Sequence, residues 1–280
     1  MAHVTSGVRS FVKPLLFKLL GEKGYFWFQV YGKLRDIRYR LVEEDEMALL
    51  PFFIGDRDEV LDLGANYAYY SERMSHLCRT GKVYAFEPIP FTYRVCKKII
   101  GLKKLHNVEL YQLGVGNSNE KLTFEVPLAD FGAISAGQSH IAGRNNDRPG
   151  KERLHNFDAH QLVEAEIVRV DDFLPNLSRL SFVKLDIEGA EYMALEGMKK
   201  TLDRFHPVIL IEVVPFFLEG FGIPEAKLVA LIEDMGYLFF LYDPASKKLN
   251  KANPPLLERN YILIHRSKAA EFENIIENAE

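Results

Sequence analysis

Val60-Leu-Asp-Leu-Gly-Ala-Asn-Tyr67 is the stretch that decides the fold, and Val83-Tyr-Ala-Phe-Glu-Pro88 follows it along the chain. Each stretch is a short apolar run that stops at an acid, Asp62 in the first and Glu87 in the second. Gly64 lets the backbone turn tightly or approach a ligand closely. A carboxylate at the end of the second run can accept hydrogen bonds from the two hydroxyls of a ribose. Together the stretches predict the first two strands of a nucleoside-binding α/β sheet, with the site at the carboxyl ends of the strands.

Composition narrows the class of protein. The chain has 280 residues, of which 48% are hydrophobic and 26% charged, as is ordinary for a globular protein. A net charge of −4 gives no sign of a nucleic-acid binder. Cys78 and Cys96 lack metal-ligand spacing, so we expect reduced core thiols in a cytoplasmic protein. No early apolar run is long enough to span a bilayer.

The first forty residues differ from the rest because basic side chains outnumber acidic ones. Apolar residues recur there at helical spacing, and an aromatic cluster, Tyr25-Phe-Trp-Phe28, follows. We expect residues 1–44 to form a basic amphipathic helical extension, and residues 45–280 to form a single domain. The apolar stripe of the extension can pack on that domain as a helical cap. Alternatively, residues 1–40 can lie on an anionic membrane surface.

Strand-like apolar runs alternate with helical periods from residue 59 onward, which is typical of a mostly parallel sheet with helices on both faces. The expected strands are residues 60–63, 82–86, 108–113, 182–187, 208–213, 237–242 and 261–265, with a further short strand at 121–126. The expected helices are residues 67–77, 91–100, 191–204 and 225–235. Residues 127–164 break this rhythm and are expected to form a long irregular insertion, which is either a lid or binding loop or else disordered. Within it, residues 130–153 are expected to close over the binding site and supply specificity.

The glycine turn distinguishes between two nucleoside cofactors. A dinucleotide pyrophosphate needs several glycines near a helix N-terminus. Here the turn reads Gly64-Ala-Asn-Tyr-Ala-Tyr69, so Asn66 and Tyr69 occupy the second and third glycine positions. S-adenosylmethionine carries a sulfonium and an amino acid instead of a phosphate. A turn with one glycine beside acidic and amide side chains favours S-adenosylmethionine.

These residues resemble the FkbM-type S-adenosylmethionine-dependent methyltransferases. The resemblance rests on the two opening stretches, on Phe182-Val-Lys-Leu-Asp-Ile-Glu-Gly-Ala-Glu191 and on Pro207-Val-Ile-Leu-Ile-Glu212. It implies a class I methyltransferase (Rossmann-like) fold, with a seven-stranded sheet whose last strand is antiparallel. It also implies O-methylation, commonly of a sugar or another secondary-metabolite hydroxyl.

One position departs from the family pattern. The first loop of the family usually reads G-A-N-x-G, and this chain has Ala68 at the second glycine. Alanine favours a negative φ and adds one methyl group, so we expect the turn to keep a negative φ there and still bind the cofactor.

Six residues are expected to contact the cofactor. Asp62 and Gly64 border its methionine end, and Asn66 either receives its carboxylate or caps the next helix. Glu87 binds the ribose. Val115 and Gly116, which follow the third strand, border the adenine or form a simple turn.

Three residues are candidates for the general base that removes a proton from the acceptor hydroxyl. Asp186 lies at the end of the fourth strand, Glu188 follows this strand, and His140 comes from the irregular segment. Lys184 lies on the same strand face as Asp186 and is expected to lower the pKa of this aspartate. Lys184, Asp186 and Glu191 can alternatively form an ionic network that joins strand to helix. Asp186, Glu188 and Glu212 could bind Mg²⁺, but we expect no metal because no tight D-x-D pair occurs.

The sequence therefore predicts an S-adenosylmethionine-dependent O-methyltransferase whose partner is a small-molecule hydroxyl acceptor, expected to contain a sugar. Two alternatives remain: a non-catalytic nucleoside-binding protein of the same fold, and an NAD(P)-dependent oxidoreductase.

Overall fold

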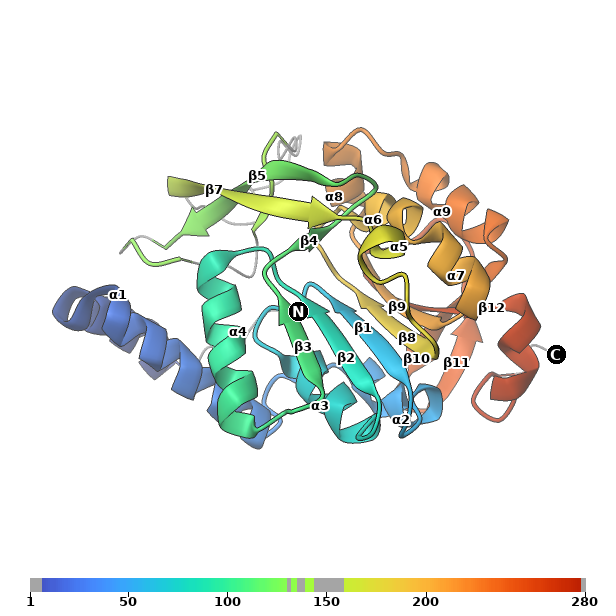
Figure 1. The fold of residues 1–280 in the computed structure, drawn as a ribbon, viewed down its shortest axis with the longest axis horizontal. Helices are drawn as coiled ribbons and strands as arrows, with labels where there is room; N and C mark the ends of the chain where they lie inside the picture. Colours follow the sequence, from blue (N-terminus) through green and yellow to red (C-terminus); the bar gives the residue numbers. More distant parts are fainter. Residues whose placement is uncertain (1–6, 130–131, 135–138, 144–158, 278–280) are drawn as a thin grey trace.

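A computed structural model describes residues 7–129, 132–134, 139–143 and 159–277 (Figure 1). Its centre is an eight-stranded sheet with the order β11-β10-β12-β9-β8-β1-β2-β3. The strands are β1 (Glu59–Leu63), β2 (Lys82–Phe86), β3 (Val108–Tyr111), β8 (Leu180–Leu185), β9 (Val208–Val213), β10 (Tyr237–Asp243), β11 (Lys248–Lys251) and β12 (Arg259–His265).

The sheet has the expected class I arrangement with one extra strand. Strands β3, β2, β1, β8 and β9 are mutually parallel, and β12 runs antiparallel to β9. The predicted antiparallel last strand is therefore confirmed. The predicted number of seven strands is wrong, because β11 adds an edge strand antiparallel to β10. That strand is short and polar, so its sequence lacks the apolar run that marks the others.

Helices cover both faces of this sheet. They are α2 (Leu50–Phe53), α3 (Tyr69–Leu77), α4 (Pro90–Lys103), α5 (Val170–Phe173), α6 (Glu191–Gly197), α7 (Lys199–Phe205), α8 (Pro215–Gly220) and α9 (Glu225–Asp234), with 3-10 helices at Asp45–Leu49 and Arg266–Phe272. The predicted helix 191–204 is two helices, α6 and α7. A Cβ at Gly197, the last residue of α6, would lie 1.8 Å from the Gly116 carbonyl oxygen, so glycine permits this close approach.

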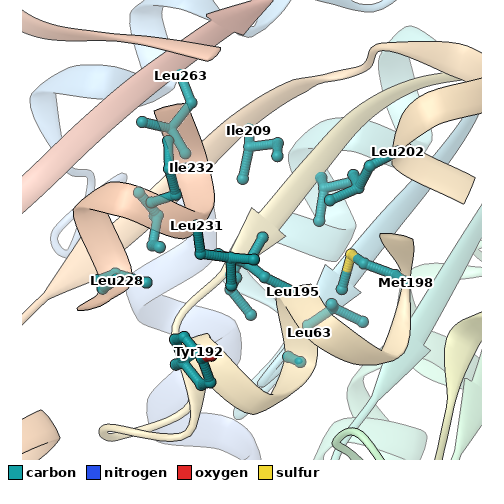
Figure 2. Close-up of a cluster of buried hydrophobic side chains, with 14 of the residues drawn as sticks. Leu63, Tyr192, Leu195, Met198, Leu202, Ile209, Leu228, Leu231, Ile232 and Leu263 are labelled. Carbon is teal, nitrogen blue, oxygen red and sulfur yellow. The ribbon is translucent and has the colours of Figure 1, made fainter. Parts of the chain in front are cut away.

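Successive side chains along the strands point to opposite faces of the large sheet, so each face packs into a hydrophobic core of its own. Leu61 and Leu63 point toward α6, α7 and α9, where Leu195, Leu202 and Leu228 complete the cluster drawn in Figure 2. Val60 points to the opposite face, toward α2 and α3. Asp62 has the same parity as Val60, so the sheet turns this acid toward α3. Cys78 and Cys96 are buried thiols, as predicted.

A second sheet of four strands lies beyond the carboxyl ends of β1, β2 and β3 (Figure 1). Its strands are β4 (Gly114–Val115), β5 (Glu120–Leu128), β6 (His140–Ile141) and β7 (Ala159–Val168), in the order β4-β7-β5-β6. The prediction of an irregular loop is therefore wrong for residues 127–128, 140–141 and 159–164, which form strands. Residues 130–131, 135–138 and 144–158 of the predicted loop lie outside the described residues. Only Ala165 and Ile167 of β7 are buried. This strand is difficult to predict from the sequence because it contains few apolar residues. Its only strand-like pattern is the alternation of Val163, Ala165 and Ile167 with glutamates.

Helix α1 (Gly7–Arg38) is broken at Gly21, which has φ 61° and ψ −161°. Its second half packs against α4, where Tyr25 and Val30 join Phe91 and Val95 in a buried cluster. In the described part of the chain, no helix combines the length and the apolar character needed to cross a bilayer.

Candidate active site

The glycine turn after β1 brings three strands together. Gly64 has φ 83°, and a Cβ there would lie 1.9 Å from the Asp186 carbonyl oxygen. Its N–H donates to the Phe86 carbonyl at 3.1 Å, and its own carbonyl accepts from Lys184 Nζ at 3.0 Å. Glycine is required here because both the left-handed backbone and the close approach exclude a side chain. The turn therefore fixes the ends of β1, β2 and β8 relative to one another.

Ala68 corrects one expectation about this turn. Its φ is 63°, in the left-handed region, so the predicted negative φ is wrong. The residue is fully buried and lies directly before α3, where its N–H donates to the Ala65 carbonyl at 2.8 Å. The turn keeps the backbone that suits the family's glycine, and the alanine adopts a conformation that L-residues disfavour.

Two buried oxygens at the end of β1 lack partners among the described residues. Asp62 is fully buried and accepts from Ser71 Oγ on α3 through Oδ2, while its Oδ1 makes no hydrogen bond. Asn66 Oδ1 is likewise buried and unpaired. Burial raises the pKa of Asp62, and the positive charge of Lys184 opposes this effect. Since buried acceptors are normally hydrogen-bonded, these two oxygens are suited to bind donors of a ligand.

Glu87 lies directly beyond β2, and its side chain is almost completely buried. Its Oε2 accepts from the Asn66 N–H at 3.0 Å, and its Oε1 accepts from the Ile89 N–H at 2.9 Å. Burial raises the pKa of Glu87 to about 7, against the effect of these two N–H groups. Each oxygen keeps a further lone pair, so the carboxylate is fixed in orientation and can still accept from a diol.

Val115 belongs to β4 of the second sheet, and Gly116 follows it directly. Both are buried; Val115 packs in the core beneath α6, and the Gly116 N–H donates to the Val168 carbonyl of β7 at 3.1 Å. The Val115 contacts join the second sheet to the core of the large sheet, and the Gly116 hydrogen bond extends the pairing of β4 with β7. The assignment of both residues to an adenine stays a prediction.

Asp186 follows β8 and is partly exposed. Its Oδ2 lies 3.0 Å from Nζ of Lys184, which is buried. Burial acts to raise the pKa of Asp186, but the charge of Lys184 and a hydrogen bond with Glu212 outweigh it and hold this pKa below its ordinary value. The predicted effect of Lys184 is thus confirmed. The lysine also reaches the Gly64 carbonyl, so it links the two halves of the site.

Glu212 on β9 shares a hydrogen bond with Asp186. Burial, followed by the negative charge of Asp186, raises the pKa of Glu212 to about 10. The two pKa values are shifted in opposite directions, so the pair holds a shared proton on Glu212 in preference to Asp186, and Glu212 can donate to the Asp186 carboxylate.

Glu188 and Glu191 occupy the loop and helix start that follow Asp186. Glu188 is half-buried with φ 58°, and its charge contributes to the raised pKa of Glu212 after burial and Asp186. Glu191 accepts from the N–H groups of Ile187 and Gly189 at 3.0 and 3.1 Å. The predicted ionic network is thus confirmed for Lys184 and Asp186, whereas Glu191 caps the loop through backbone groups.

His140 belongs to the second sheet. It is buried in β6, where its Nε2 lies 3.6 Å from Glu125 Oε2 on the paired strand β5. Its role as a base stays a prediction.

A polar cluster that was not predicted from the sequence lies beside Asp186. Tyr70 Oη donates to Glu44 Oε2 at 2.6 Å, and Asn260 Nδ2 donates to the same oxygen at 3.0 Å. Asn260 pairs in register with Glu212, and the Tyr70 ring lies 5.6 Å from Lys184 Nζ. Glu46 Oε2 is buried without a hydrogen-bond partner. The only signal in the sequence was the acidic run Glu43-Glu-Asp-Glu46 directly before an apolar segment.

Within the described ranges, no group of three or more His, Cys, Asp or Glu residues is arranged to hold a metal ion.

The sequence around this site is similar to that of known methyltransferases. The model of the methyltransferase FkbM domain family matches residues 62–239, which include Asp62, Glu87, Asp186 and Glu212. Methyltransferase sdnD of Sordaria araneosa is 28% identical over 197 residues, which cover 64% of this chain and 73% of that protein. The 2-O-methyltransferase NoeI of Sinorhizobium fredii (strain NBRC 101917 / NGR234) is 24% identical over 147 residues, or 52% of this chain and 59% of that protein.

Among solved structures, methyltransferase FkbM from Methylobacillus flagellatus KT aligns with a TM-score of 0.46 at 13% identity. The alignment covers 76% of this chain and 44% of that protein, so this chain spans less than half of its length. The match to the family model extends over more than half of the chain and contains both acids, Asp62 and Glu87, from which the site is built. The chain therefore belongs to the FkbM methyltransferase family.

Proposed function

We propose that the protein transfers a methyl group from S-adenosylmethionine to a hydroxyl of a sugar or a glycosylated or secondary-metabolite small molecule. The observation that carries the proposal is the arrangement around Gly64. Asp62 and Asn66 each present a buried oxygen without a partner, and Glu87 presents a carboxylate fixed by two backbone N–H groups.

The charges of this site favour a cationic cofactor. Asp62, Glu87 and Asp186 all surround the turn, and Lys184 is the buried cation that lies among them. A pyrophosphate would meet carboxylates here, whereas a sulfonium and an ammonium group gain from them. Asp62 and Asn66 would hold the amino acid end of S-adenosylmethionine, and Glu87 the ribose. When bound, the cofactor supplies an electrophilic methyl group.

Asp186 is the residue we assign as the base for the acceptor. It is ionised, partly exposed and fixed from two sides by Lys184 and Glu212. Its carboxylate can accept a hydrogen bond from the hydroxyl, orient the oxygen and take the proton as the new C–O bond forms. Because the pKa of Asp186 is lowered, proton transfer occurs late, and most of the acceleration comes from orientation.

Similarity to an O-methyltransferase supports a hydroxyl group as the acceptor. NoeI, at 24% identity, is a 2-O-methyltransferase, and its chemistry needs a group that binds and deprotonates a hydroxyl. The partly exposed carboxylate of Asp186 can supply that group.

Calorimetry with S-adenosylhomocysteine and NAD tests the cofactor. We expect micromolar binding of S-adenosylhomocysteine and none of NAD. Glu87→Ala should weaken that binding by about 1–3 kcal/mol, and the exposed Glu233→Ala on α9 serves as the matched control. Binding of NAD alone would support the oxidoreductase instead. Binding of S-adenosylhomocysteine without methylation of any hydroxyl in a metabolite screen would support the non-catalytic nucleoside-binding protein.

The pH dependence of the same binding sharpens the test. Since the pKa of Glu87 is raised to about 7, this carboxyl becomes protonated in mildly acidic solution and loses acceptor strength. The affinity for S-adenosylhomocysteine should therefore rise between about pH 6 and about pH 8. Glu87→Gln should flatten this rise; an equally steep rise in the variant would exclude Glu87 as its cause.

A further inference from the structure

The first half of α1 leaves large apolar side chains in solvent. Leu15, Leu19 and Leu20 are 51%, 70% and 58% exposed. Figure 1 shows this half of the helix projecting past α4 at one edge of the molecule. Large apolar side chains scattered singly are normal at a surface, but neighbouring ones indicate an interaction.

This segment is anchored to the domain. The Phe17 ring meets the Tyr25 ring edge to face, with centroids 5.7 Å apart, and Tyr25 is buried against α4. Beyond the break at Gly21 the apolar stripe continues. Leu20, directly before the break, approaches Gly24 so closely that a Cβ there would lie 2.1 Å from the Leu20 Cβ. Beyond Gly24 the exposed rings of Trp27 and Tyr31 stack, with centroids 5.6 Å apart.

Positive charge surrounds the stripe. Helices α1 and α4 together contain eleven Lys and Arg residues against two acids, whereas the whole chain has 35 against 39. Of the two acids, Asp36 is buried and Glu22 pairs with Arg94 at 2.7 Å. Lys97 and Lys98 on α4 are exposed, and Lys98 Nζ lies 5.2 Å from the Trp27 ring.

We infer that this face, formed by the exposed leucines of α1, Trp27, Tyr31 and the lysines of α4, docks the protein on an anionic phospholipid bilayer. Leucines can enter the boundary of the acyl chains, aromatic rings lie at the headgroup level, and lysines contact the phosphates. Each basic residue near such a surface strengthens the attraction.

Charge complementarity favours lipid over other occupants. A second copy would bring two basic faces together, which repel each other. Nucleic acid would satisfy the lysines but would leave the leucines without an apolar contact. An anionic bilayer offers both negative charge and hydrocarbon on one surface.

Vesicle sedimentation of the full chain tests the inference. We expect binding to phosphatidylcholine vesicles that contain phosphatidylglycerol, little binding to pure phosphatidylcholine, and weakening by salt. Leu19→Asp combined with Leu20→Asp should reduce partitioning by about tenfold or more. Lys97→Glu combined with Lys98→Glu should reduce it by a similar factor and flatten the salt dependence.

The matched control is Leu162→Asp on β7, where the leucine is 66% exposed and far from both helices in sequence. It should leave partitioning unchanged, and thermal melting should show that every variant is folded. Absence of binding to anionic vesicles, or equal loss in the control, would overturn the inference. Two further results would overturn it. One is a dimer, seen by light scattering, that the leucine substitutions dissociate; the other is binding to RNA that only the lysine substitutions abolish.

Discussion

The donor side and the acceptor side of the candidate site hold their carboxylates in different ways. On the proposed donor side, the Glu87 carboxylate accepts hydrogen bonds from two backbone N–H groups. One N–H group belongs to the glycine turn, and the other belongs to the loop that contains Glu87. On the proposed acceptor side, Asp186 interacts with two side chains. Lys184 comes from β8, the strand that Asp186 follows, and Glu212 comes from the neighbouring strand β9. Backbone N–H groups and charged side chains both act on the pKa of a carboxyl group, but burial outweighs them at Glu87, whereas Lys184 and Glu212 hold the pKa of Asp186 below its ordinary value. This difference supports our proposal that Glu87 binds the cofactor and that Asp186 takes up a proton.

The largest expected effect comes from the turn that joins the two sides. Gly64→Ala would place a methyl group 1.9 Å from the Asp186 carbonyl oxygen on a backbone with φ 83°. We expect a loss of roughly 3 kcal/mol or more in the free energy of unfolding, measured by urea denaturation. Gly101→Ala in α4, where nothing lies within 4 Å, is the control and should not destabilise the protein. If the two variants were equally stable, the close approach of Gly64 to the Asp186 carbonyl would not be needed to hold the two sides of the site together.

The next effect separates binding from proton transfer. Asp186→Asn should lower kcat about 100-fold while leaving the affinity for S-adenosylhomocysteine nearly unchanged. His140→Ala and Glu188→Gln should have smaller effects on kcat. A loss of activity confined to His140→Ala would move the base to the second sheet and contradict our assignment of Asp186.

The protonated state of Glu212 has a consequence for stability. Since its pKa rises from an ordinary value to about 10 on folding, the folded state binds the proton more tightly. This carboxyl therefore lowers stability progressively as the pH rises from about 4.5 toward about 10. Glu212→Gln cannot ionise and can still donate to Asp186, so it should be the more stable protein at alkaline pH. Parallel pH–stability curves for the variant and the unaltered protein would argue against the shared proton.

The smallest effect concerns Ala68. Ala68→Gly should relieve the left-handed backbone and at the same time lose one buried methyl group and gain chain entropy in the unfolded state. We expect a net change in unfolding free energy below about 1 kcal/mol. A thermal melting curve measures it, and a large destabilisation would mean that the methyl group is needed for packing.

Much of the large sheet could be predicted because its strands are buried on both faces. Strands β2 and β9 were predicted with their observed bounds, since apolar residues fill most of each strand. The second sheet could not be predicted as readily, because β7 is mostly exposed and its alternation is confined to a few residues. The break between α6 and α7 also escaped prediction; Gly197 at the end of α6 lies against the Gly116 carbonyl, a contact with a residue distant in sequence.

The sequence by itself determined the first two acid-ending strands, the glycine turn, the candidate residues Asp62, Glu87 and Asp186, and the family. Local patterns suffice there because a strand, a turn and the acid that follows are neighbours in the chain. Only the tertiary structure decided that Ala68 adopts a positive φ, that Glu44, Tyr70 and Asn260 form a cluster beside Asp186, and that Glu212 carries its proton. These features arise where elements distant in sequence pack together, because burial and neighbouring charges act through space.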